Sequence, residues 1–206
     1  MLEVLSLLQS MYPEAVTALN HENPFELLVA TILSAQCTDE RVNIITQYLF
    51  PAFPTALDLA NASFDDVATL VKSAGLWQTK TRNLINTAKI LVEKHGGEVP
   101  RTREELEALP GVGRKTASVV LANAFQIPAI AVDTHVFRVA NRIGLAHALN
   151  PYQTELQLME AIPEKYWIDA HHWLILHGRA LCKARKPLCD QCPLRPHCSY
   201  FQDSSS

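Results

Sequence analysis

The sequence predicts an all-α protein, and two patterns carry the prediction. Apolar residues recur at helical spacing through most of the 206 residues, starting with MLEVLSLLQSMYPE at the N-terminus. Helix-start signals, each a capping side chain followed by a carboxylate in the first turn, occur at Asn23, Ser63 and Thr102. The apolar run 127–132 is a candidate strand without a partner, so we interpret it as a buried connector.

The same patterns place three helices in the second half of the chain. We predict them over residues 115–125, 134–143 and 169–177, with Gly178 ending the last of them. A shorter helix follows Thr102. Pro110 and Gly111 must end it, because proline cannot continue a helix and glycine readily adopts turn conformations.

Composition limits the classes to which the protein can belong. Apolar residues make up 48% of the chain, enough for a real core, and no apolar run approaches the roughly 20 residues of a membrane span. A signal peptide begins with positive charge, whereas the amphipathic N-terminal segment carries Glu3. We therefore expect a soluble, cytoplasmic protein with no membrane partner.

The charge is distributed unevenly. The net charge is −3, which by itself argues against a nucleic-acid partner. Residues 111–150 nevertheless hold four Lys or Arg against one acid, and residues 171–198 hold five against one. If these segments share a face, a positive surface lies on an otherwise acidic protein, and the local field outweighs the net charge. Ordinary solvated helix faces would give the same counts, so charge alone leaves both interpretations open.

Four of the five cysteines lie in the 17-residue segment CKARKPLCDQCPLRPHC, with the spacing C-x6-C-x2-C-x5-C. They are Cys182, Cys189, Cys192 and Cys198. Three prolines prevent this segment from forming a helix, and thiolates that share one metal centre would supply the missing order. Uneven spacing in one compact loop suits a [4Fe–4S] cluster at least as well as structural zinc. Cys37, far away in the sequence, is interpreted as a small buried residue.

The segment LPGVGRKTA, residues 109–117, predicts a helix-hairpin-helix. Its two glycines are one residue apart, which makes the loop too short to hold a triphosphate as a P-loop does. Gly111 and Gly113 would let the backbone approach a ligand closely, and the second helix begins with free amides at a positive dipole end. Such a turn suits one phosphodiester of a DNA backbone, which it would bind without reading sequence.

Lys115 and Asp133 each have two interpretations. Lys115 lies in a first helical turn beside Arg114, where the dipole and the neighbouring charge favour the neutral amine, the nucleophilic form. The alternative is a lysine that binds phosphate as a point charge. Asp133 is a good N-cap for the helix that follows it. It is also the only acid within residues 111–150, and near Lys115 it could assist deprotonation and stabilise positive charge on a sugar ring.

Four motifs in a fixed order carry a family resemblance: LPGVGRKTA, AVDTHVFRV, HHWLILHGR and the cysteine segment. From about Pro24 to Cys198 the chain resembles the bacterial endonuclease III family of helix-hairpin-helix DNA glycosylases and AP lyases. The resemblance implies the helix-hairpin-helix DNA glycosylase fold, with two helical domains and a DNA-binding cleft between them. A helical barrel domain would span 21–130, and residues 1–20 plus 131–206 would form the iron–sulfur cluster domain.

The resemblance also implies roles for single residues. Lys115 matches the family's Schiff-base lysine, Asp133 its essential aspartate, and the four cysteines the ligands of a [4Fe–4S] cluster. Gln36 matches the glutamine that fills the gap left by a flipped nucleotide, and Leu76 the wedge that parts the opposite strand. Without the family, Gln36 would be a helix-end amide and Leu76 a core residue. The other implied DNA contacts are Gly111, Gly113, Arg114, His135, Lys183, Arg185 and Lys186.

The implied activity is removal of oxidised pyrimidines from damaged double-stranded DNA in base excision repair. Lys115 would attack the sugar C1′ of a flipped nucleotide, the base would leave, and β-elimination would nick the strand. We expect a monomer that is nucleoid-associated when bound to DNA. An adenine glycosylase is a weaker match, because that relative has serine in place of the lysine. A non-catalytic DNA-binding module, in which Lys115 only contacts phosphate, is the alternative from another class.

Overall fold

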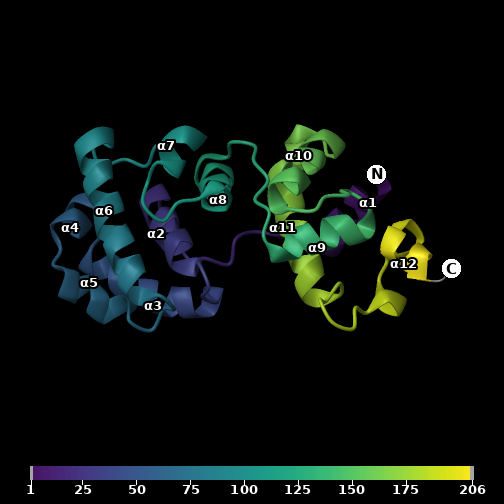
Figure 1. Cartoon of the computed structure of the whole chain (residues 1–206), viewed down its shortest axis with the longest axis horizontal. Helices are drawn as coiled ribbons and strands as arrows, with labels where there is room; N and C mark the ends of the chain where they lie inside the picture. The colour runs from purple at the N-terminus through teal and green to yellow at the C-terminus, as the bar shows by residue number, and fades with distance from the viewer. Residues whose placement is uncertain (1, 205–206) are drawn as a thin grey trace. The chain divides into compact units, whose positions relative to one another are not determined.

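The computed structural model describes residues 2–204, and within them the backbone is helical and contains no β-strand (Figure 1). The all-α prediction is therefore confirmed. The connector 127–132 is not a strand, and its residues Ala129, Ile130 and Ala131 are almost fully buried. None of the helices in the described part of the chain is long and apolar enough to cross a membrane.

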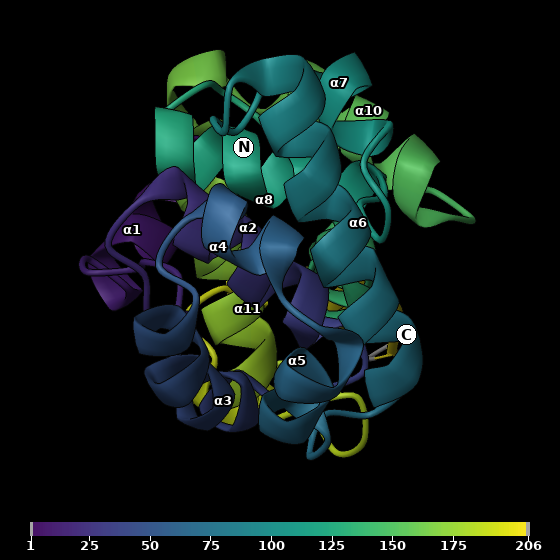
Figure 2. The ribbon, with the colours of Figure 1, turned by 90° about the vertical axis from the view of Figure 1, so that its left-hand side faces the viewer.

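The chain divides into two compact units, Thr17–Ile127 and Met1–Val16 with Pro128–Ser206. The first comprises α2 (Pro24–Ser34), α3 (Asp39–Ala52), α4 (Ala56–Asn61), α5 (Phe64–Val71), α6 (Trp77–His95), α7 (Arg103–Glu107) and α8 (Arg114–Phe125). Helices α4 and α5 pack against the long helix α6 (Figure 2). Helix α2 contacts α3, α6 and α8, and its Leu27, Leu28 and Leu33 are fully buried. The core of this unit therefore forms around α2.

Side-chain caps start most helices of the Thr17–Ile127 unit. In five of them a backbone amide of the first turn donates to the side chain of the N-cap residue, which is Asn23, Thr38, Thr55, Ser63 or Thr102. The three caps predicted from the sequence are among these. Helices α6 and α8 differ, because their N-cap residues Leu76 and Gly113 make no side-chain capping bond. The first-turn amides of these two helices therefore lack the bond that satisfies them elsewhere in the unit.

The second unit joins the N-terminal helix to the last third of the chain. It comprises α1 (Leu2–Met11), α9 (Thr134–Ile143), α10 (Pro151–Ala161), α11 (Trp167–Ala180) and α12 (Ser199–Ser204), with 3-10 turns η1 (Glu164–Tyr166), η2 (Cys189–Gln191) and η3 (Arg195–His197). Helix α11 packs against both α1 and α9. Their shared core includes Leu8, Val139 and Leu174, all fully buried. Packing of apolar faces thus unites segments from opposite ends of the sequence.

The prediction that Gly178 ends a helix was wrong, because α11 continues to Ala180. A Cβ at Gly178 would lie 3.1 Å from the Cβ of His135 and 3.1 Å from Nη2 of Arg138 on α9. Close packing of α11 against α9 therefore favours glycine here, and the residue does not terminate the helix. The helix predicted over 134–143 has the expected ends, and the one predicted over 115–125 begins one residue earlier, at Arg114.

Two leucines on the same helix test the packing of α1. Leu8 is fully buried, whereas Leu2 is 67% exposed. We expect Leu8→Ala to lower the free energy of unfolding by about 2–4 kcal/mol, because apolar burial is lost and a cavity remains. Leu2→Ala should change it by less than about 0.5 kcal/mol. Urea unfolding of both variants measures the difference, and equal losses would contradict the described packing of α1.

Candidate functional site

Residues 103–125 form a short helix, a tight turn and a second helix, as the helix-hairpin-helix prediction requires. Helix α7 is capped at its C-terminus by Ala108. Two backbone hydrogen bonds close the turn, from the amide of Leu109 to the carbonyl of Leu106 and from the amide of Val112 to the carbonyl of Leu109. Gly111 has a φ of 80°, a left-handed conformation that favours glycine. The turn is therefore a specific, glycine-dependent structure with an exposed tip.

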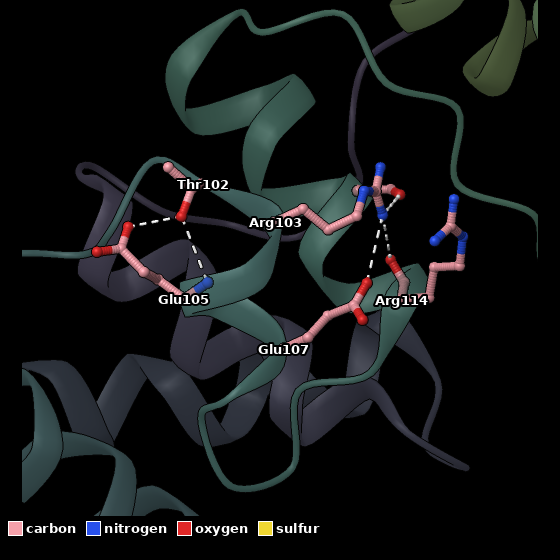
Figure 3. A network of polar contacts seen from close by, with 6 residues as sticks. Thr102, Arg103, Glu105, Glu107 and Arg114 are labelled. Atoms are coloured by element: carbon pink, nitrogen blue, oxygen red, sulfur yellow. Dashed lines mark hydrogen bonds and ion pairs between the residues drawn. The ribbon is translucent and has the colours of Figure 1, made fainter.

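Side chains from three helices hold this turn in place. Thr87 of α6 donates its hydroxyl hydrogen to the carbonyl of Pro110 at 2.9 Å. Arg103 of α7 donates to Oγ of Ser118 at 2.9 Å and to the carbonyl of Arg114 at 3.4 Å, both on α8 (Figure 3). Arg103 thus ties the two helices of the hairpin to each other, while Thr87 ties the turn to α6.

Lys115 lies in the first turn of α8 and is exposed. Its helix begins at Arg114, after the N-cap residue Gly113, without a side-chain cap and without an acidic residue in the first turn. Arg114 adds a second cation at the same place. Uncapped amides, the positive end of the helix dipole and two cations therefore coincide at one exposed helix start.

Asp133 caps α9, since its Oδ1 accepts a hydrogen bond from the amide of Val136 at 2.7 Å. The N-cap interpretation is therefore confirmed, and this bond uses one of the two carboxylate oxygens. His135 lies in the first turn of α9, with Nδ1 3.2 Å from Nη2 of Arg138. Burial lowers the pKa of His135, and the nearby Asp133 carboxylate opposes that shift. His135 therefore acts as a neutral, polar side chain beside the capping carboxylate.

Gln36 and Leu76 occupy two left-handed turns that touch. Gln36 follows α2 with a φ of 54°, and Leu76 precedes α6 with a φ of 57°. A Cβ at Gly75 would lie 3.2 Å from the carbonyl oxygen of Gln36, so the two turns are in contact. Gln36 is exposed and Leu76 is 60% exposed. The pattern-based interpretation of Leu76 as a core residue is therefore wrong, and the structure brings both implied strand-contacting residues together.

Lys80 was not identified from the sequence. Its side chain is 4% exposed, and among the described residues its Nζ is the one buried side-chain polar atom without a hydrogen-bond partner. Burial lowers the pKa of this amine, while a nearby charge on Cys37 would raise it. A neutral amine avoids the free-energy penalty of burying a charge. Cys37, interpreted from the sequence as a small buried residue, is half-buried.

The four cysteines of the C-terminal segment line one small cavity, of about 20 Å³, in the second unit. All four are half-buried, and none forms a disulfide. The remaining lining residues are Ile143, His177, Leu181, Pro187, Leu188, Leu194, Arg195, Tyr200 and Phe201. Four thiols therefore face a mostly apolar space that solvent reaches only in part.

A [4Fe–4S] cluster fits this donor set. Each of its irons takes one cysteine, so the ligands must surround a space rather than converge on a point. In residues 2–204 no three side chains of metal-binding type are placed to hold a single ion, which structural zinc would require. Burial raises the pKa of Cys192 and of Cys198, and charge on the other cysteines of the segment adds to both shifts. Coordination by iron would stabilise the thiolate form of these cysteines, and cluster binding would therefore release their protons.

Two arginines of α9 hold the cysteine segment. Arg142 donates to the carbonyls of Lys183 at 2.7 Å and Ala184 at 3.1 Å, and its Nη1 lies 3.6 Å from Sγ of Cys182. Arg138 donates to the carbonyl of Cys182 at 3.1 Å. These two cations, counted above toward a positive surface, are thus engaged inside their own unit. The sequence shows only that a spacing of four puts both on one helix face, without indicating what that face contacts.

The loop cations Lys183, Arg185 and Lys186, which the resemblance implies as DNA contacts, are all exposed. A hydrogen bond from the amide of Leu188 to the carbonyl of Leu181, 3.0 Å long, closes the base of their loop. Arg142 donates hydrogen bonds to two backbone carbonyls of this loop, so the three cations extend from a loop that is held in place.

Tyr12 and His177 lie beside Cys192, and neither was identified from the sequence. Oη of Tyr12 is 3.2 Å from Nδ1 of His177, and Nε2 of His177 is 3.5 Å from Sγ of Cys192. Burial lowers the pKa of His177 to about 4. Burial, and then the charge of Cys192, raises the pKa of Tyr12 to about 12.

The predicted site residues fall into two groups, one in each unit. The Thr17–Ile127 unit carries Gln36, Leu76, the hairpin glycines, Arg114 and Lys115. The other unit carries Asp133, His135, the loop cations and the four cysteines.

Relatives of known identity match nearly the whole chain. The chain is 49% identical to endonuclease III of Escherichia coli (strain K12) over 199 residues, 97% of this chain and 94% of that protein. It is 47% identical to endonuclease III of Bacillus subtilis (strain 168) over 189 residues, 91% of this chain and 86% of that protein.

Solved structures show the same similarity to endonuclease III. The structure of a trapped endonuclease III–DNA covalent intermediate matches with a TM-score of 0.92 at 42% identity, covering 100% of this chain and 98% of that chain. A non-covalent endonuclease III–DNA complex matches with a TM-score of 0.92 at 44% identity, covering 98% and 95%.

The model of the HhH-GPD superfamily of base excision DNA repair proteins matches residues 29–164. This match, with the helical fold and the hairpin, places the chain in that superfamily. The model of the iron–sulfur binding domain of endonuclease III matches residues 182–198, which is the cysteine segment. The chain belongs to the endonuclease III family, and its cofactor is a [4Fe–4S] cluster.

Two glycines of the hairpin provide a matched test of the turn. A Cβ at Gly111 would lie 2.8 Å from Nδ2 of Asn83, whereas one at Gly113 would meet nothing within 4 Å. We expect Gly111→Ala to lower the free energy of unfolding by about 1–2 kcal/mol, because alanine is strained at positive φ. Gly113→Ala should stay within about 0.5 kcal/mol of the parent. Urea unfolding checks both, and an unchanged Gly111→Ala protein would refute the turn geometry.

Proposed function

We propose that this chain excises oxidised pyrimidines from damaged double-stranded DNA and nicks the strand, with Lys115 as nucleophile and Asp133 as its acid–base partner. The observation that carries the proposal is the exposed Lys115 at an uncapped helix start directly after a glycine turn. As a member of its family the chain is a DNA glycosylase and AP lyase of base excision repair. The two solved relatives with a TM-score of 0.92 are endonuclease III bound to DNA.

The hairpin is suited to bind a single backbone phosphate. Amides of the first helical turn that have no side-chain acceptor can donate to phosphate oxygens, and the dipole favours the negative charge. Gly111 and Gly113 keep side-chain bulk away from the approaching backbone. This contact fixes the register of the DNA without reading bases. Lys115 would then be placed against the sugar of the nucleotide next to the bound phosphate.

The chemistry begins with the neutral amine of Lys115. Its nitrogen bonds to C1′ while the glycosidic bond breaks, and the base leaves with that electron pair and a proton. The sugar ring opens to an imine, loss of a proton from C2′ follows, and the 3′ C–O bond breaks. Asp133 would take the proton from the amine and stabilise positive charge on the sugar.

The remaining residues would prepare the DNA for this step. Gln36 would fill the gap left by the flipped nucleotide, and Leu76 would part the opposite strand. Phosphate contacts would come from Arg114, His135 and the loop cations Lys183, Arg185 and Lys186. We also propose that residues 21–130 act as a helical barrel domain and residues 1–20 plus 131–206 as the cluster domain. The enzyme would act as a cytoplasmic monomer.

Borohydride trapping tests the role of Lys115. Wild type on duplex DNA carrying one thymine glycol should give a covalent adduct, because borohydride reduces the imine to a stable amine. Lys115→Gln should give no adduct and lose strand cleavage by on the order of 10³-fold or more, since the nucleophile is absent. Lys94→Gln, the same change at an exposed lysine in the last turn of α6, serves as control. An adduct from Lys115→Gln would disprove the assignment.

Two substitutions separate the capping and chemical roles of Asp133. Asn is as good an N-cap as Asp, so Asp133→Asn should preserve stability yet slow base release by about 10²–10⁴-fold. Asp133→Ala should in addition lower the free energy of unfolding by about 1 kcal/mol, because the bond to Val136 is lost. Single-turnover base release and urea unfolding give the two readouts. Wild-type base release by Asp133→Asn would leave Asp133 as a cap only.

A further inference from the structure

Two hydrogen bonds in series connect the segment after α1 with the cluster cavity. Oη of Tyr12 lies 3.2 Å from Nδ1 of His177, and Nε2 of that ring lies 3.5 Å from Sγ of Cys192. The two rings meet edge-on, with centroids 6.1 Å apart and planes at 74°. His177 is 1% exposed, so water does not compete for either ring nitrogen. The relay, Tyr12–His177–Cys192, lies wholly within one unit of the chain.

The direction of both hydrogen bonds follows from the chemistry of a ligating cysteine. A thiolate bound to iron carries no proton and can only accept, so Nε2 of His177 donates to Sγ of Cys192. In a neutral imidazole the other nitrogen is then a bare acceptor, and the hydroxyl of Tyr12 donates to Nδ1. Tyr12 therefore selects the histidine tautomer that offers a hydrogen to the sulfur. With the other tautomer, a nitrogen lone pair would face the sulfur.

We propose that Tyr12 and His177 set the reduction potential of the [4Fe–4S] cluster through the hydrogen bond to Cys192. Hydrogen bonds to ligand sulfurs favour the more electron-rich state of a cluster and so raise its potential. Tyr12 strengthens the donor, because accepting a hydrogen bond at Nδ1 polarises the ring and its Nε2–H group. The proposal rests on the assigned cluster and does not depend on the roles of Lys115 or Asp133.

Cys192 differs in this respect from Cys182. The donor nearest Cys182 is Arg142, a permanent cation that two backbone carbonyls also hold in place. The donor at Cys192 is the imidazole of His177, which donates to the sulfur when its Nε2 carries a hydrogen. Removal of a single oxygen atom, the hydroxyl oxygen of Tyr12, is therefore enough to change the hydrogen bonding of the His177 ring that donates to Cys192.

Tyr12→Phe is the first test, because it deletes one oxygen and keeps the ring. Film voltammetry of the holoenzyme should show a lower cluster potential than wild type, at equal iron content. Tyr166→Phe removes a hydroxyl from another half-buried tyrosine of the same unit and should leave the potential unchanged. In electron–nuclear double resonance of a paramagnetic cluster state, a proton coupling that exchanges in D2O should weaken in Tyr12→Phe only.

His177→Gln tests whether Tyr12 acts through the ring. An amide N–H at this position can still donate to the sulfur, but the nitrogen that faces Tyr12 is gone. We expect Tyr12→Phe to lower the potential in wild type and to have no further effect in the His177→Gln background, since the two side chains act as one unit.

Three results would overturn the proposal. One is a wild-type potential in Tyr12→Phe, and another is a shift equal to that of Tyr166→Phe. The third is a Tyr12→Phe shift of the same size with and without His177. If His177→Gln fails to retain the cluster, the comparison of Tyr12→Phe with Tyr166→Phe, by potential and by proton coupling, decides the question.

Discussion

Hydrogen bonds from two arginines of α9 to the backbone of the cysteine segment are the interaction on which the cluster unit depends. The segment contains three prolines and only short 3-10 turns, so its own backbone bonds cannot order it. Arg138 and Arg142 donate to carbonyls at the end of α11 and in the following loop. They thereby space the cysteines around the cavity and anchor the loop cations, so the cofactor site and a proposed DNA contact share one support.

The other unit has two helices that begin without a side-chain cap. Five of its helices satisfy first-turn amides with a side chain, whereas α6 and α8 do not. A missing side-chain cap lowers helix stability by about 1 kcal/mol, and first-turn amides are the groups that we propose bind a DNA phosphate. The same unit places three non-glycine residues, Gln36, Leu76 and Gln126, at positive φ, and it buries the amine of Lys80. Gln126 ends α8, whereas Gln36 and Leu76 lie at the turns proposed to contact DNA and Lys80 follows Leu76 by one helical turn, as expected where function outweighs stability.

Much of the fold and of the site could be predicted, because the responsible signals are short-range. Helical periodicity, caps with a partner three residues away, and the turn at Gly111 involve only neighbours in sequence. The cysteine ligand set was equally visible, since its four members lie within 17 residues. Predictions failed where a residue in a sequence pattern is compatible with two different structural roles. Gly178 looked like a helix end but serves helix packing, and Leu76 fitted an apolar pattern although a left-handed turn leaves it exposed.

The sequence by itself determined the helical class, the hairpin, the metal ligands and, through four motifs in order, the family. Only the tertiary structure decided which side chains support them: Arg138 and Arg142 against the cysteine segment, Thr87 beneath the hairpin, and Tyr12 beside His177. Those bonds join residues 23 to 165 positions apart. Their geometry depends on how apolar faces pack helices from distant parts of the chain, and no pattern of neighbouring residues encodes that packing.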